Sequence, residues 1–112
     1  MAVLTAQSID LSGTTLTFGS ADVAGDVFDN SGNTLLYVKN EDVSSHDVTL
    51  ELQKNIEIEG LSLTITDPVV TVPTTDEKII GPFPKGWFDD SNGQVNVSYD
   101  DITSVTVAVL EI

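Results

Sequence analysis

Residues Thr103–Leu110 read Thr-Ser-Val-Thr-Val-Ala-Val-Leu, a run in which Val occupies every second position. In a β-strand, successive side chains point to opposite faces, so Val105, Val107 and Val109 would share one face. The segment Gln94–Tyr99 repeats this alternation. Both segments are therefore predicted to be strands with one face turned to a core.

The composition favours strands along the rest of the chain. Val, Thr and Ile account for 35 of the 112 residues, whereas Ala occurs five times. Their β-branched side chains fit a pleated sheet better than a helix, and no segment has helical spacing of its apolar residues. The further strands that we expect are Val3–Leu11, Thr14–Phe18, Leu35–Asn40, Val48–Leu52, Ile56–Ile58, Leu61–Ile65, Val69–Val72 and Lys78–Ile80.

Polar turn sequences separate these runs. Asp29–Asn33 and Asp89–Gly93 are two of them, and Ser12-Gly13 predicts an N-terminal hairpin. About eight short strands predict an all-β fold, a single-domain β-sandwich over residues 1–112, of jelly-roll or immunoglobulin-like type. Residues 1–8 would form either an edge strand of this domain or an extended arm that pairs with a neighbour.

The charge excludes several classes of partner. Eighteen acidic residues stand against four Lys and no Arg, which gives a net charge of −14. Without a basic patch, neither nucleic acid nor an anionic membrane is an expected partner. The N-terminus has no signal-peptide pattern and no apolar run is long enough to span a membrane, so we expect synthesis in the cytoplasm. Cys is absent, which excludes disulfides and thiolate chemistry.

No pattern of residues predicts an enzyme. The single histidine, His46, lies in the polar stretch Glu41–Asp47, and we interpret it as a solvated loop residue. Neither a nucleophile elbow nor a scaffolded triad accompanies it. We expect no cofactor, with calcium as the alternative because carboxylate-rich loops suit that ion, although turn formation explains the same residues. The calcium candidates are Asp22, Asp26 and Asp29 in one loop, and Asp89 and Asp90 in another.

One segment interrupts the alternation. Ile79–Phe88 contains two Pro, two Gly, two Phe and the only Trp. It is predicted to be an aromatic plug that closes one end of the sandwich, a binding loop with rigid aromatic anchors, or both. The candidate interface residues are Pro82, Phe83, Pro84, Trp87 and Phe88 from this segment, with Val3 and Leu4 from the N-terminus.

Two strings of residues resemble a known family. The first is Gly25-Asp26-x-Phe28-x-Asn30-x-Gly32-x-Thr34-x-Leu36-x-Val38-Lys39-Asn40. The second is Ile80-Gly81-Pro82-Phe83-Pro84, followed by Phe88, Gly93-Gln94-Val95-x-Val97-x-Tyr99 and Val105-Thr106-Val107-Ala108. Together they resemble the small all-β head decoration (cement)-like proteins of tailed viruses of prokaryotes. The resemblance extends from about Ala2 to the C-terminus, and the Gly-Pro-Phe-Pro segment is its most specific part.

This resemblance implies a structural virion protein that binds the outside of the assembled head. Its partners would be the major capsid protein and further copies of itself, for example in a trimer. Two alternatives stay open: another virion component, such as a head–tail connector, tail or fibre-base protein, and a carbohydrate-binding β-sandwich. An exposed Trp87 beside Phe88 would favour sugar binding. The excess of acidic residues predicts an outward-facing, mutually repelling coat and a high-salt, halophilic or marine host.

Overall fold

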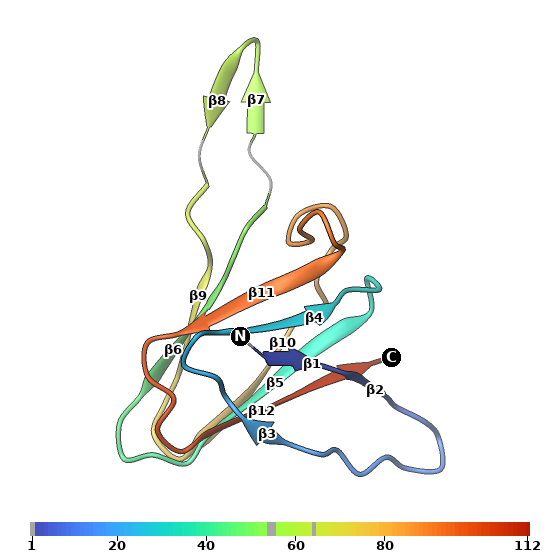
Figure 1. Cartoon of the computed structure of the whole chain (residues 1–112), viewed down its shortest axis with the longest axis vertical. Helices are drawn as coiled ribbons and strands as arrows, with labels where there is room; N and C mark the ends of the chain where they lie inside the picture. Colours follow the sequence, from blue (N-terminus) through green and yellow to red (C-terminus); the bar gives the residue numbers. More distant parts are fainter. Residues whose placement is uncertain (1, 54–55, 64) are drawn as a thin grey trace.

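Twelve β-strands form the part of the chain that the computed structural model describes, residues 2–53, 56–63 and 65–112 (Figure 1). Within those ranges there is no helix, and so none that could cross a membrane. The strands are β1 (Ala2–Leu4), β2 (Ala6–Ser8), β3 (Gly19–Ser20), β4 (Asp26–Asp29), β5 (Thr34–Asn40), β6 (His46–Leu50), β7 (Ile56–Ile58), β8 (Leu61–Leu63), β9 (Val69–Val72), β10 (Asp76–Ile80), β11 (Gln94–Tyr99) and β12 (Val105–Glu111).

Two sheets pack face to face as a single-domain β-sandwich, which confirms the predicted fold class. The first sheet has the strand order β1-β4-β11-β6-β9, and the second has the order β10-β5-β12-β2, with β3 also paired to β12. The chain changes sheet at almost every step from β4 to β12. The longest ladder joins β5 and β12, whose antiparallel register runs from Val105↔Asn40 to Glu111↔Thr34.

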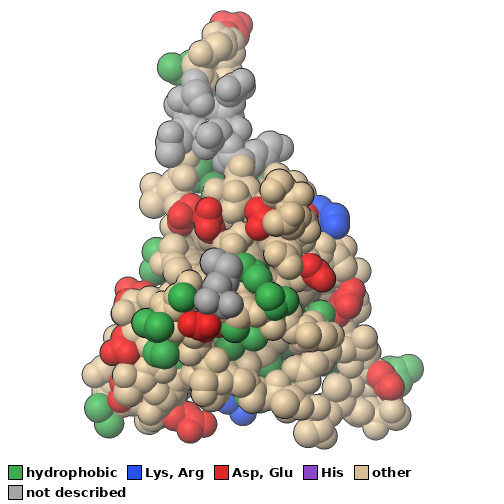
Figure 2. Space-filling view, in the orientation of Figure 1, with side chains coloured by type: hydrophobic (Ala, Val, Ile, Leu, Met, Phe, Trp, Pro, Cys, Tyr) green, Lys and Arg blue, Asp and Glu red, His purple; other side chains and the backbone are tan. Residues whose placement is uncertain are grey.

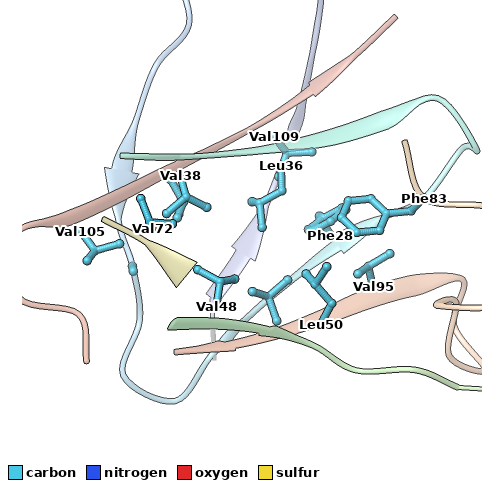
Figure 3. Packing of buried hydrophobic residues seen from close by; sticks show 13 residues of the cluster. Phe28, Leu36, Val38, Val48, Leu50, Val72, Phe83, Val95, Val105 and Val109 are labelled. Atoms are coloured by element: carbon cyan, nitrogen blue, oxygen red, sulfur yellow. The ribbon is translucent and has the colours of Figure 1, made fainter. Parts of the chain in front are cut away.

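The core lies between the two sheets, and the alternating strands supply most of it (Figure 3). Val105, Val107 and Val109 are all at most 2% exposed, as their spacing predicts. Burying apolar side chains contributes about 1.5–3 kcal/mol for each Val- or Leu-sized group, and is the main favourable term. The remaining members of the cluster are Ala21, Phe28, Leu36, Val38, Val48, Leu50, Val72, Phe83, Val95 and Val97.

The N-terminal segment differs from the expected hairpin. Val3–Leu11 is not one strand, because β1 pairs in parallel with β4 in one sheet while β2 pairs in parallel with β12 in the other. The chain passes between the sheets at Thr5. The predicted hairpin at Ser12-Gly13 is also wrong. The segments on its two sides do not pair as strands, and the side chain of Gln7 instead exchanges two hydrogen bonds with the backbone of Thr17. Residues 2–8 thus serve as edge strands of their own domain.

Residues 26–29 were expected in a loop, and that expectation is wrong. They form β4, which lies between β1 and β11 in the first sheet. The strand is entered through Gly25, which has a φ of +93°, and a Cβ there would lie 2.6 Å from the carbonyl oxygen of Val97. Only glycine tolerates both the positive φ and this close approach.

The remaining strand boundaries differ in smaller ways. Thr14–Phe18 is not a strand, and the pairing begins instead at Gly19. The strand expected at Leu61–Ile65 ends at Leu63, and Thr64 lies outside the described residues. The described residues hold twelve strands where about eight were expected from ten candidate runs. Relative to those ten runs, Thr14–Phe18 is lost, the N-terminal run divides in two, and β3 and β4 are short additions.

A two-stranded hairpin, β7–β8, projects from one end of the sandwich along the 47 Å long axis of the molecule (Figure 1). Its register pairs Ile56 with Leu63 and Ile58 with Leu61. The turn residues Glu59 and Gly60 have φ values of 48° and 81°. Two successive positive φ angles are typical of the type I′ turn, whose twist matches a tight hairpin.

Candidate functional site

The aromatic segment, residues 81–88, crosses from the end of β10 to the loop before β11. Its first peptide bond, Gly81–Pro82, is cis. Gly81 has a φ of +127°, and a Cβ at this position would lie 2.9 Å from Cδ2 of Leu35 and 3.0 Å from the carbonyl oxygen of Thr34. The segment therefore begins in close contact with the first residues of β5.

Two rings of the aromatic segment pack against the core. Phe83 is 2% exposed, and its ring packs against that of Phe28 (Figure 3), with 5.5 Å between the ring centroids. The Phe83 centroid also lies 5.6 Å from that of Phe88. Edge-on and tilted aromatic pairs at this separation are favourable beyond their buried area. Pro82 and Pro84 are exposed, and Trp87 is half-buried. The segment thus acts as the aromatic plug that was one of its two predicted roles.

One buried amide fixes this segment in place. The side chain of Asn30 is nearly inaccessible, and its Nδ2 donates to the carbonyl oxygen of Phe83 at 3.1 Å and to Oδ1 of Asp89 at 2.6 Å. The backbone carbonyl of Asn30 accepts from Nζ of Lys85 at 3.0 Å, and its N–H donates to the carbonyl of Gly93 at 3.1 Å. We call this group of contacts the Asn30 clamp. It was not identified as a site from the sequence.

The aromatic segment also supports the base of the projecting hairpin. The backbone carbonyl of Trp87 accepts a hydrogen bond from the N–H of Gln53 at 2.8 Å. On the same stem, the N–H of Leu52 donates to Oδ1 of Asp67 at 3.0 Å. The hairpin therefore leaves the sandwich from a stem that is hydrogen-bonded to the body.

The N-terminal candidates line a shallow groove. Val3 is 70% exposed, whereas Leu4 is half-buried against the core. Both residues border an open groove of about 390 Å³. The other residues that line it are Thr5, Gln7, Thr17, Gly19 and the almost fully buried Val107, Ala108 and Val109 of β12. None of the residues that line this groove carries a charge.

The first group of calcium candidates is divided between different environments. Asp26 is fully buried and accepts a hydrogen bond from the hydroxyl of Tyr99 at 2.6 Å. Burial, together with this carboxylate, raises the pKa of Tyr99 far above its ordinary value. Asp22 caps the backbone N–H of Ala24 at 2.9 Å, and Asp29 is exposed beside Gln94.

The second group serves the turn before β11. Asp89 belongs to the Asn30 clamp, and Asp90 accepts from Nδ2 of Asn96 and from the backbone N–H groups of Gln94 and Asn92. The Asn96 bond and the two backbone bonds lower the pKa of Asp90. Among the described residues, no three His, Cys, Asp or Glu side chains are arranged to hold a metal ion.

His46 is not the solvated loop residue that we expected. It is the first residue of β6, is 4% exposed, and its Nε2 donates to Oδ2 of Asp42 at 2.9 Å. Its Nδ1 lies 3.6 Å from Oδ1 of Asp100. Burial acts to lower the pKa of His46, but the Asp42 hydrogen bond and the charges of Asp100 and Asp101 outweigh it, so the pKa is raised.

Comparisons with protein-family models, with curated proteins and with solved structures find no match to this chain.

The Asn30 clamp predicts a large effect of a small substitution. Asn30→Asp removes both Nδ2 donors and places a second carboxylate against Asp89. It should lower the free energy of unfolding by about 3 kcal/mol in urea titrations. Asn33→Asp, an exposed change in the same turn, is the matched control and should cost less than about 0.5 kcal/mol. Equal losses in the two variants would show that the clamp contributes nothing specific.

The environment of His46 predicts a pH dependence of stability. A raised folded-state pKa stabilises the fold fully below the unfolded pKa of about 6.5, and the gain is lost as pH rises through the folded pKa. The Tm should therefore fall by a few degrees between about pH 6 and about pH 9. His46→Gln should reduce that fall. If the Tm profiles of the two proteins stay parallel over this range, His46 is not the titrating group.

Proposed function

We propose that this chain is a structural protein of a viral particle and decorates the outside of the assembled head. In this role it binds the major capsid protein and further copies of itself, in an assembly such as a trimer. It stabilises the shell by binding and catalyses no reaction. The proposal starts from the resemblance to head decoration proteins.

The observation that carries the proposal is the way in which the two resembling strings meet. The first string contains β4, the Asn30 turn and β5, and the second contains the aromatic segment, β11 and β12. β4 pairs with β11 and β5 pairs with β12, while Asn30 holds the carbonyl of Phe83. The residues that carry the resemblance therefore form one continuous frame, as expected if they specify a shared fold.

The surface charge supports an outward-facing role. Acidic side chains are spread over the face seen in Figure 2, and few basic ones accompany them. Many of these acids cap turns at strand ends, as Asp10, Asp22, Asp90 and Asp101 do. A coat with this charge keeps particles apart, and it favours a high-salt, halophilic or marine setting in which screening limits self-repulsion.

The sugar-binding alternative has less support. An exposed Trp87 beside Phe88 would favour it, but Trp87 is half-buried and Phe88 packs edge-on against Phe83. The alternatives within the virion, a head–tail connector, a tail protein or a fibre-base protein, differ from decoration mainly in location and copy number.

Imaging of intact particles that contain the chain tests the proposal. We expect cryo-electron microscopy to place many copies over the head surface, and purified protein added to shells that lack it should raise their resistance to heat and to low salt. A single ring at one vertex, or copies on the tail alone, would contradict decoration. In the add-back assay, Asn33→Asp protein should fold normally and bind shells like the wild type, so it is a suitable control.

A further inference from the structure

A lysine, an asparagine and an aspartate meet in the Asn30 clamp. Nζ of Lys85 donates to the backbone carbonyl of Asn30 at 3.0 Å, and Nδ2 of Asn30 donates to Oδ1 of Asp89 at 2.6 Å. An amine, a carboxamide and a carboxylate are thus gathered around one buried residue. These are the groups from which an amide bond between two side chains can form, because a lysine amine is a nucleophile and a carboxylate can move the protons.

The turn after β4 places Lys85 beside the carboxamide. The side chain of Lys85 packs against Gly32, with its Cγ and Cδ atoms 3.4 Å and 3.7 Å from the point where a Cβ would stand on that glycine. Its Nζ reaches the backbone carbonyl of Asn30, which belongs to the same residue as the carboxamide carbon Cγ. Lysine has a flexible four-carbon stem, so rotations within the side chain can carry Nζ from that carbonyl to Cγ.

The Asn30 carboxamide is held at both of its ends. Oδ1 accepts a hydrogen bond from the N–H of Gly32 at 2.9 Å, while Nδ2 contacts the carboxylate of Asp89. When an amine attacks Cγ, negative charge develops on Oδ1, and a fixed N–H donor stabilises that charge. A carboxylate beside Nδ2 can deliver the proton with which this nitrogen leaves. Asn30 is 4% exposed, which limits attack by water in place of the amine.

We propose that Lys85 and Asn30 form an intramolecular amide bond, with Asp89 as the group that transfers the proton. The neutral amine of Lys85 attacks Cγ of Asn30, so that the Nζ–Cγ bond forms and the Cγ–Nδ2 bond breaks. Asp89 takes the proton that Nζ loses and gives it to Nδ2, which departs as ammonia. The products are one secondary amide and one ammonia molecule, and the reaction needs no oxidant, reductant or other reactant.

This bond makes permanent an attachment that the clamp otherwise makes by hydrogen bonds. It joins residues that are 55 positions apart, in the turn between β4 and β5 and in the aromatic segment. A covalent link of this kind restricts the unfolded chain far more than the folded one, so it stabilises the fold. The inference goes beyond the proposed function and does not rest on it.

Mass spectrometry of the denatured, full-length protein tests the inference. The wild type should be lighter than the mass calculated from its sequence by one ammonia molecule, and peptide mapping should find a branched peptide that joins Lys85 to Asn30. Incubation at about pH 9 should drive the reaction towards completion, because only a neutral amine attacks. Asp89→Asn should slow the loss of ammonia at least about ten-fold.

Lys85→Arg is the decisive variant. It keeps the positive charge and the hydrogen-bond donors, but the guanidinium stays protonated and does not attack a carboxamide. Its mass should remain that of the full sequence, and it should unfold at a lower temperature than the wild type. Lys78→Arg, which changes an exposed lysine of β10, is the matched control and should lose ammonia like the wild type.

Three outcomes would overturn the inference. The first is a wild type that keeps its full mass after the incubation, and the second is a Lys85→Arg protein that loses ammonia equally. The third is a loss of ammonia without the branched peptide, because an asparagine that cyclises onto its own backbone loses the same mass. The measurement uses the free protein, so its outcome is independent of where the chain lies in a particle.

Discussion

The Asn30 side chain is the constraint on which the rest of this structure depends. A buried amide left without partners costs about 1–3 kcal/mol, so its position is fixed by the groups that satisfy it. Its Nδ2 reaches both the carbonyl of Phe83 and the carboxylate of Asp89, residues from a segment more than fifty positions away. The turn between β4 and β5 is thereby joined to the connection between β10 and β11, and each of these two connections links one sheet to the other.

This attachment decides how the aromatic segment is buried. With the backbone of Phe83 held by Asn30, its ring reaches Phe28 in the core and packs against Phe88. The most aromatic part of the sequence therefore closes one end of the sandwich. Pro82 and Pro84 are exposed at this end and Trp87 is half-buried, so these residues, with the exposed Val3, remain candidate interface residues.

The sequence predicted the strands in which local pattern and long-range packing agree. Leu36 and Val38 of β5 are buried on the side that the period of two indicates. Val105, Val107 and Val109 of β12 are buried in the same way, and β12 also buries Ala108 and Leu110 on its other side. β4 was missed because Asp residues stand at both of its ends. The buried one, Asp26, is satisfied by the hydroxyl of Tyr99, seventy-three positions along the chain. A partner at that separation leaves no local signal.

The same reason accounts for the errors at the candidate sites. His46 stands among polar residues and reads as a loop, yet it is buried by the pairing of β6 with β9 and held by Asp42. Asn30 reads as a turn former, which it is, but its role as a clamp depends on residues of the aromatic segment. The N-terminal run divides at Thr5 because β1 pairs with β4 and β2 pairs with β12. Thr5 itself has no property from which this division could be predicted.

Hydrogen exchange of the wild type and the Asn30→Asp variant tests the central claim, that the Asn30 side chain makes the aromatic segment part of the core. In the wild type we expect strong protection of the amides that pair β4 with β11 and of the Asn30 N–H, and fast exchange in β7 and β8. In Asn30→Asp the Gln53 N–H, which donates to the carbonyl of Trp87 in the aromatic segment, should lose protection. An unchanged exchange rate of the Gln53 N–H in that variant would contradict the account.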